Sequence, residues 1–209
     1  MGIVIELQQE ALNSNTDILS LLRKAYLVAR KLHLEEFETW LNREMNGYEA
    51  NDEVPKYRIY HGEIKAWNPY HGWVPVLFDK EVPLTTHACR DPVSNLITIA
   101  DKDQGAALAF PNELNAYLSQ HSNFPVPTKY QLVIPINLIY DTLETLRNKI
   151  LDWAITLEEN GIVGDGLQFT QEEIKKAQNP TVNNITNIYG NIIDSQIQQG
   201  TEHSNQKKL

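Results

Sequence analysis

The chain has 209 residues, a formal net charge of −9 and a single cysteine, Cys89. This length suits one domain with an appendage, and the acidic balance argues against a general nucleic-acid-binding protein, which normally carries a basic face. No apolar run reaches the roughly 18 residues that a membrane-spanning helix needs, and the first ten residues lack the basic start of a signal peptide. One cysteine excludes an intramolecular disulfide and a multi-cysteine zinc site. We therefore predict a cytoplasmic protein.

The first 50 residues show helical periodicity. Apolar residues at the spacing i, i+3, i+4, i+7 predict amphipathic helices over residues 3–12, 18–29 and 34–45. The polar run at residues 13–16 separates the first two helices and supplies a cap for the second. Gly47 stands where a left-handed C-terminal cap belongs. We expect two or three antiparallel helices joined by short turns.

The middle of the chain is predicted to be irregular and rich in strands. Nine of the ten prolines lie between Pro55 and Pro135, and proline ends or kinks helices. Alternating side chains predict a β-hairpin over residues 57–78, and the apolar run at 131–134 predicts a buried strand. Two short helices are expected, one capped by Asp91 with Pro92 as its first helical residue, and another that opens at Pro111.

The last long helix is predicted over residues 138–157, where one face stays apolar, and Gly161 ends it. Thr170 and Glu173 then have the spacing of a capping box for a brief helix. Because exposed apolar stripes of this width are unstable in water, the N-terminal helices should pack against the long helix. The side chains expected to meet are Leu22, Tyr26, Phe37, Trp40 and Leu41 on one side and Leu146, Ile150 and Trp153 on the other.

The last 31 residues, 179–209, differ in composition from the rest of the chain. Ten of them are Asn or Gln, and only four are charged. Thr, Asn, Gly and β-branched residues are poor helix formers, whereas Asn and Gln form ladders between stacked strands, so we predict an extended segment that forms homo-oligomers. The alternatives are an unstructured tail or a helix that coils with a second copy. The side chains expected to mediate self-association are Ile185, Ile188, Tyr189, Ile192, Ile193 and Ile197.

The most unusual local sequence is WNPYHGW at residues 67–73. A rigid hairpin tip with Tyr, His and Trp side chains is suited to stack on a base or another planar ligand, and histidine titrates near neutrality, which makes it a candidate general base. The alternative is structural, and it is the commoner use of large aromatic residues: Pro and Gly shape a turn while the tryptophans pack the hairpin onto the helices. The candidate ligand-binding residues are Trp67, Asn68, Tyr70, His71 and Trp73.

The sequence contains no recognisable catalytic or metal-binding motif. His87 and Cys89 are two residues apart, but no CxxC or HxxxH pattern completes a metal site, and we expect neither a metal nor a cofactor. P-loop, GxGxxG and GxSxG motifs are also missing, which favours a function other than catalysis. Asp141, Glu144 and Lys149 on the last long helix are interpreted as exposed charges.

Four segments of the chain resemble one protein family. They are ELQQEAL at residues 6–12, LLRKAYLVARKLHLEEFETWLNREMNGY at 21–48, PKYRIYHGEIKAWNPYHGWVPV at 55–76 and LRNKILDWAITLEENGI at 146–162. Together they resemble the AbiTii domain, a bacterial module of abortive-infection and other conflict systems, over about residues 3–178. The tail, with YGN followed by SQIQQGT, is similar to the C-terminal tails of bacterial defence proteins. The resemblance implies a role in anti-phage defence and supplies no catalytic residues.

We therefore expect an α+β fold, in which an N-terminal helical hairpin and a long C-terminal helix pack on a small antiparallel β-element. The domain should occupy residues 1–178, and the tail at 179–209 should be a self-association element. The expected function is defence through binding and self-association, with another protein of the defence system as a partner. The alternatives are a toxin enzyme that acts on nucleic acid or nucleotide near Tyr70 and His71, and a structural adaptor without a ligand. Neither a membrane nor nucleic acid is expected as a partner.

Overall fold

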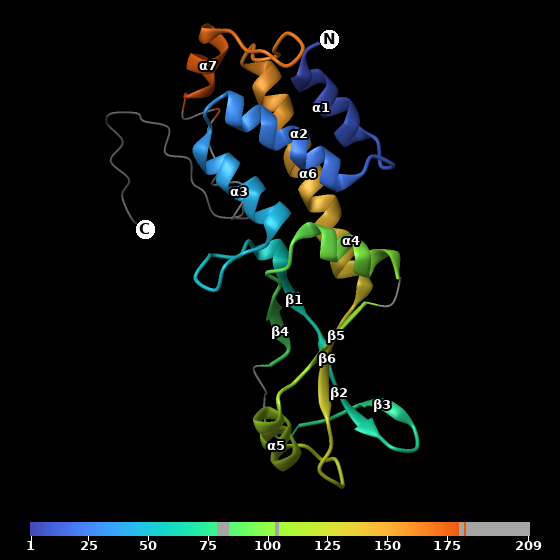
Figure 1. The fold of residues 1–209 in the computed structure, drawn as a ribbon. Helices are drawn as coiled ribbons and strands as arrows, with labels where there is room; N and C mark the ends of the chain where they lie inside the picture. Colours follow the sequence, from blue (N-terminus) through green and yellow to red (C-terminus); the bar gives the residue numbers. More distant parts are fainter. Residues whose placement is uncertain (79–83, 103–104, 180–181, 183–209) are drawn as a thin grey trace, which may run out of the picture.

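The computed structural model describes residues 1–78, 84–102, 105–179 and 182. The molecule is elongated, with a helical end and a sheet end (Figure 1). Helix α6 runs from the sheet end into the helical end and packs there against the N-terminal helices. The helices of the helical end are α1 (Ile3–Leu12), α2 (Ile18–Lys31), α3 (Glu35–Asn46), α6 (Ile136–Glu159) and α7 (Gln171–Ala177).

Two antiparallel sheets form the other end of the molecule. The smaller sheet pairs β1 (Ile59–His61) with β4 (Thr86–Ala88), and the larger has the strand order β3-β2-β6-β5. The strands of the larger sheet are β2 (Glu63–Asn68), β3 (Gly72–Pro75), β5 (Ala106–Ala109) and β6 (Tyr130–Ile134). The connecting elements are the 3-10 turn η1 (Lys56–Arg58) and the helices α4 (Val93–Asp101) and α5 (Asn112–His121). This arrangement confirms the predicted α+β fold class.

The hairpin predicted over residues 57–78 is divided between the two sheets. Only β2 and β3 form it, with Trp67 opposite Trp73, while β1 pairs with β4. The chain passes from one sheet to the other at Gly62, where a Cβ atom would lie 2.6 Å from the carbonyl oxygen of Val133. Because glycine alone has no Cβ, it permits this close approach of two backbone segments.

A core built by α1, α2, α3 and α6 holds the helical end together. The rings of Phe37 and Trp153 stack with their centroids 4.0 Å apart. Trp40 and Ile150 are wholly buried in the same core, and Tyr26 is half-buried against it. The predicted packing of the N-terminal helices on the long helix is therefore confirmed.

Helix α6 connects this core to a second core, which is formed at the sheet end by residues of the strands, α4, α5 and the start of α6. Near its start, Ile139 is buried together with sheet residues such as Ile64 and Leu132. One turn further on, Leu143 packs against both cores, and Leu146 belongs to the helical core. One uninterrupted helix of 24 residues thus contributes to both ends of the molecule.

Several helix ends differ from the predicted ones. The cap of α2 is Asp17 and not a residue of the polar run 13–16 before it. The carboxylate of Asp17 accepts a hydrogen bond from the amide of Ser20, in the first turn of the helix, at 2.9 Å. Helix α4 begins after Pro92, so this proline is the cap and not the first helical residue. The predicted capping box of α7 is present, because Thr170 and Glu173 each accept a hydrogen bond from the other's backbone amide.

The described chain ends on the surface of the helical core. Gln178 donates a hydrogen bond through Nε2 to the carbonyl oxygen of Leu32 at 2.7 Å, and Val182 is buried in the core. The six side chains predicted to mediate self-association lie in 183–209, outside the described residues. Among the helices of the described residues, none is long and apolar enough to cross a membrane.

Candidate functional site

The aromatic turn at residues 67–73 forms the tip of the β2–β3 hairpin at the sheet end of the molecule (Figure 1). The side-chain oxygen of Asn68 accepts hydrogen bonds from the amides of Tyr70 at 2.8 Å and His71 at 3.2 Å. Gly72 adopts a positive φ of 72°. Tight turns commonly contain an asparagine whose side chain accepts hydrogen bonds from backbone amides later in the chain, together with a glycine of positive φ. Asn68 therefore shapes the tip of the hairpin.

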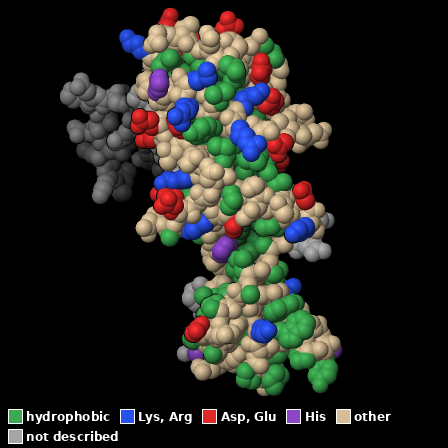
Figure 2. Space-filling model, in the orientation of Figure 1, with side chains coloured by type: hydrophobic (Ala, Val, Ile, Leu, Met, Phe, Trp, Pro, Cys, Tyr) green, Lys and Arg blue, Asp and Glu red, His purple; other side chains and the backbone are tan. Residues whose placement is uncertain are grey.

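The aromatic side chains of this turn are exposed. Tyr70 is 91% exposed, Trp67 41% and Trp73 37%, and the two tryptophan rings lie edge to face with centroids 5.4 Å apart. Figure 2 shows hydrophobic side chains gathered over this end of the molecule, with few charged ones among them. Neither tryptophan belongs to the helical core. Exposed apolar surface of this kind often marks an interaction site.

A groove of about 820 Å³ runs beside the two tryptophans, between the hairpin, α5 and residues 127–129. Its uncharged polar side chains are already hydrogen-bonded within the protein. Thr128 donates through Oγ1 to the carbonyl oxygen of Trp67 at 2.6 Å, and the side chain of Asn115 bonds two backbone groups. Lys129 is exposed and forms no ion pair within the described residues. Among the residues that the structure describes, no carboxylate lines the groove. The groove therefore offers a ligand apolar surface and one positive charge.

Tyr70 and His71 lie outside this groove, on the exposed turn. Among the described residues, no side chain forms a hydrogen bond that would orient the imidazole of His71. A general base is usually oriented by a third group. The structure thus places Trp67 and Trp73 together in the groove wall and leaves the other two side chains on the solvent-exposed turn.

A second constellation, which sequence reasoning missed, lies where the helical end meets the sheet end. Glu44 of α3 and Arg58 of η1 are wholly buried. Arg58 donates through Nε, at 2.9 Å, and through Nη2 to Oε2 of Glu44. Its Nη1 donates to the carbonyl oxygen of Asp91 at 2.7 Å. Because desolvated charges are costly, a buried pair of this kind depends on complete hydrogen bonding around it.

Three aromatic side chains complete the hydrogen bonding of this pair. The hydroxyls of Tyr48 and Tyr57 both donate to Oε1 of Glu44, and Nε1 of Trp40 donates to the hydroxyl oxygen of Tyr57 at 2.8 Å. Burial raises the pKa of Tyr57, and the charge of Glu44 raises it further, so this phenol stays protonated as a donor. Burial acts to lower the pKa of Arg58, but the carboxylate of Glu44 outweighs it and keeps the guanidinium charged.

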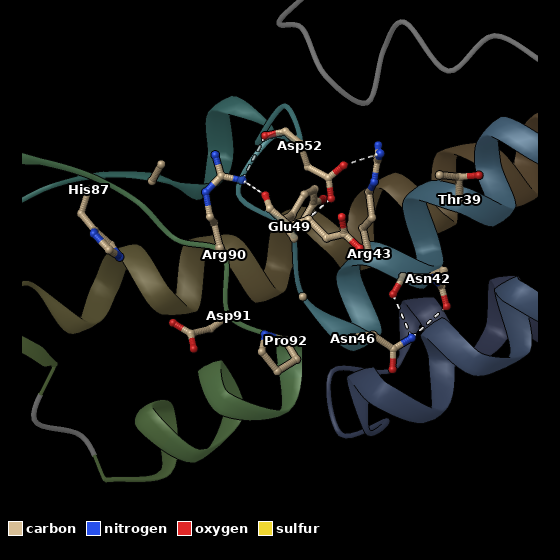
Figure 3. Close-up of a pocket in the computed structure, with 13 residues that line it drawn as sticks. Thr39, Asn42, Arg43, Asn46, Glu49, Asp52, His87, Arg90, Asp91 and Pro92 are labelled. Atoms are coloured by element: carbon tan, nitrogen blue, oxygen red, sulfur yellow. Dashed lines mark hydrogen bonds and ion pairs between the residues drawn. The ribbon is translucent and has the colours of Figure 1, made fainter.

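A cavity of about 700 Å³ lies beside this network, between α3, the loop 47–52 and residues 87–92 (Figure 3). Two residues that line it, Tyr48 and Asp91, are hydrogen-bonded to the buried ion pair. Ligand sites are common at the junction of two structural units, and this volume lies in their usual range. The cavity is thus a second candidate site, built from residues that the sequence motifs did not indicate.

Other titratable residues singled out in the sequence have mixed environments. In the described part of the chain, no three His, Cys, Asp or Glu side chains are grouped so as to hold a metal ion. Cys89 is buried, and burial raises the pKa of its thiol. Contrary to the expectation of an exposed charge, Lys149 is half-buried with Nζ 5.6 Å from the ring centroid of Tyr57, and burial lowers its pKa. Asp141 and Glu144 are exposed as expected.

A helical end, a small antiparallel sheet and a shared long helix define an α+β domain with two candidate binding surfaces. The chain belongs to the AbiTii family, whose model matches residues 2–182. The family suggests a role in abortive-infection defence, and the match confirms the resemblance carried by the four sequence segments. No curated protein and no solved structure matches the chain.

Proposed function

We propose that the chain acts in bacterial abortive-infection defence by binding a ligand at the tip of its β2–β3 hairpin and by self-association through its C-terminal tail. The observation that carries the binding part is the exposure of Trp67 and Trp73 beside a groove whose uncharged polar side chains are already hydrogen-bonded. Such a surface has little to offer a hydrophilic ligand, but it gains free energy when an apolar group covers it.

The expected ligand carries a flat ring. Tryptophan side chains stack on planar groups, and stacking on a base contributes about 1–3 kcal/mol. The exposed ammonium of Lys129 favours a ligand with a negative charge near that ring over a cationic one. A small planar molecule and an aromatic side chain of a partner protein both meet this description.

Binding is better supported than catalysis at this tip. A toxin enzyme that used Tyr70 and His71 would need those side chains beside a bound substrate, but they lie outside the groove. His71 also lacks an orienting partner among the described residues. The defining groups of the site are therefore the two tryptophan rings.

A phage-protection assay tests this proposal. Cells that express the full chain with Trp67→Ala and Trp73→Ala together should lose protection at an unchanged protein level, because the stacking surface is gone. Leu12→Ala is the matched control, since Leu12 is also exposed, at 71%, but lies in the helical end. If the double variant protects as well as the control, the hairpin tip is not the binding site.

The proposal of self-association rests on the tail sequence. Its apolar residues, Ile185, Ile188, Tyr189, Ile192, Ile193 and Ile197, are interspersed with Asn and Gln and with very few charged residues, a composition that favours stacking of extended strands. Val182 is excluded from this role because it is buried in the helical core.

Sedimentation analysis of full-length protein tests the tail. Ile192→Lys combined with Ile197→Lys should reduce the number of copies in the assembly to that of a chain ending at residue 182, because each copy brings like charges into the apolar contacts of the stack. The matched control is Gln198→Lys with Gln206→Lys, which adds the same charge at polar positions. The same number of copies per assembly for all four proteins over a wide concentration range would show that the tail does not drive assembly.

A further inference from the structure

The cavity between α3, the loop 47–52 and residues 87–92 is separate from the hairpin groove and has a different chemical character. It contains a guanidinium whose charge is not balanced by a carboxylate. Arg90 donates through Nη1 to the carbonyl oxygens of Glu49 and of Asp52, the latter at 3.0 Å. Across the described residues, Arg90 forms no ion pair, although the chain has 27 acidic and only 18 basic residues.

The guanidinium of Arg90 retains donors for a ligand. Arginine has five N–H donors in a planar fork, and the two carbonyl contacts of Arg90 both involve Nη1. Figure 3 shows this side chain extending from the 87–92 segment toward the loop of Glu49 and Asp52. The donors on Nε and Nη2 have the geometry that binds two oxygens of a carboxylate or a phosphate.

The wall that carries Arg90 is fixed in position by close backbone contacts. The carbonyl oxygen of Arg90 accepts a hydrogen bond from the amide of Tyr48 at 2.9 Å. Gly47 has a φ of 95°, and a Cβ there would lie 2.9 Å from the same oxygen. Behind this wall, the buried pair of Glu44 and Arg58 is hydrogen-bonded both to the hydroxyl of Tyr48 and to the backbone carbonyl of Asp91. A site held in this way loses little conformational entropy when a ligand binds.

The carboxylates of the cavity do not cancel the charge of Arg90. Asp52 is paired with Arg43 at 2.5 Å and also accepts the amide of Glu49 at 2.8 Å. Asp91 accepts a hydrogen bond from the side chain of Asn95, and Figure 3 shows it pointing away from the guanidinium of Arg90. The side chain of Glu49 is exposed, where water and salt screen its charge.

We propose that this cavity binds a small polar molecule through a single oxyanion group, a phosphate monoester or a carboxylate, which Arg90 receives with its two remaining donor positions. The body of the ligand lies along the polar face of α3, where Asn42 and Asn46 are exposed and line the cavity, with the side-chain amide of Asn46 donating to Oδ1 of Asn42 at 2.8 Å. The volume of about 700 Å³ accommodates such a molecule. This proposal does not depend on the role of the hairpin.

Isothermal titration of the full chain with inorganic phosphate, adenosine monophosphate and succinate tests the proposal. At least one of the three should bind, and Arg90→Gln should weaken that binding by about tenfold or more, because a charge-assisted bidentate contact is lost. Arg30→Gln is the matched control, since Arg30 is an exposed arginine of the helical end paired with Glu38. Binding of succinate alone identifies a carboxylate ligand, and binding of the two phosphates identifies a phosphate ligand.

A further variant should change the affinity in the opposite direction. Asp52→Asn removes a negative charge beside Arg90 and should tighten binding several-fold, whereas Glu36→Gln, the same change at an exposed position of α3, should leave it unaltered. If Arg90→Gln fails to fold, Arg90→Lys keeps the charge but not the fork and should still weaken binding. Absence of binding for all three probes at about 10 mM, or equal affinities of wild type and the Arg90 variants, would overturn the proposal.

Discussion

Glu44 and Arg58 lie 14 residues apart and form a wholly buried ion pair that joins α3 to the first turn of the sheet end. The same arginine also fixes a third segment, because its backbone carbonyl accepts the amide of Cys89 at 2.8 Å and its Nη1 bonds the carbonyl of Asp91. One side-chain pair therefore positions a helix, a turn and the residues that lead into α4.

Glu44→Ala should destabilise the protein by about 3–5 kcal/mol, because it leaves the charge of Arg58 buried without a partner. Urea unfolding at neutral pH measures this loss. Glu36→Ala, at an exposed position of the same helix, should change stability by no more than about 0.5 kcal/mol.

The paired replacement Glu44→Leu with Arg58→Met distinguishes a buried charge from a simple loss of packing. Removing both charges together should restore part of the stability that Glu44→Ala loses, because no unpaired ion remains in the core. A loss below about 1 kcal/mol for Glu44→Ala alone would show that water reaches Arg58 when the carboxylate is absent.

Trp153→Ala should destabilise the protein by about 3–5 kcal/mol, the usual effect of deleting a large buried aromatic side chain. Trp153 is 7% exposed and stacks on Phe37. Ile155→Ala is the control on the same helix, because Ile155 is 38% exposed. Thermal unfolding of the two variants should separate them clearly, and similar midpoints would contradict a core between α3 and α6.

Acid should destabilise the loop before α7 through Glu173. Burial acts to raise the pKa of this carboxyl, but the hydrogen bonds that it accepts from Thr170, Gly164 and Val163 outweigh burial and lower it below 4.5. A carboxyl with a lowered folded-state pKa stabilises the fold above its unfolded-state pKa, and this contribution is lost as the pH falls through the folded-state value.

Glu173→Gln should therefore be less stable than wild type at neutral pH, and the difference should shrink as the pH falls below 4.5. Thermal midpoints recorded from neutral pH down into this range provide the comparison. A constant difference between the two proteins at every pH would show that the carboxylate has the same pKa in the folded and unfolded states.

Gly62→Ala should destabilise the sheet end by about 1–3 kcal/mol, the usual effect of forcing an extra group into a packed region. The new Cβ would meet the backbone carbonyl of Val133 at 2.6 Å, and backbone cannot move aside as a flexible side chain does. Chemical denaturation measures the loss. Unchanged stability would mean that β2 and β6 separate at this point without cost.

The helical end could be predicted because its signal is local. Apolar residues three and four apart face one side of a helix, and the stripes that contain Phe37, Trp40 and Trp153 are the ones that meet in the core. The sheet pairings depend on contacts between distant segments. Nothing in the sequence near Gly62 indicates that the strand after it pairs with residues 130–133, so the alternation of side chains predicts one continuous hairpin.

The buried ion pair was missed because charged residues on a helix are usually exposed. Glu44 nevertheless follows Trp40 by four residues and Leu41 by three, which places it on the apolar face of α3. This position is the signal that sequence reasoning had available. For Arg58 there was no comparable signal, because its burial depends on the segment of Asp91, which lies far along the chain.

The helical end and the sheet end are not independent folding units, because α6 belongs to both cores and Leu143 contacts each of them. If one core opened, about half of α6 would remain without tertiary support, and helical segments of about 12 residues are marginal in water. Melting of either end therefore removes part of the framework of the other. Heat should unfold the described domain in one cooperative transition, and amide hydrogens at opposite ends of α6 should exchange with solvent through the same global opening.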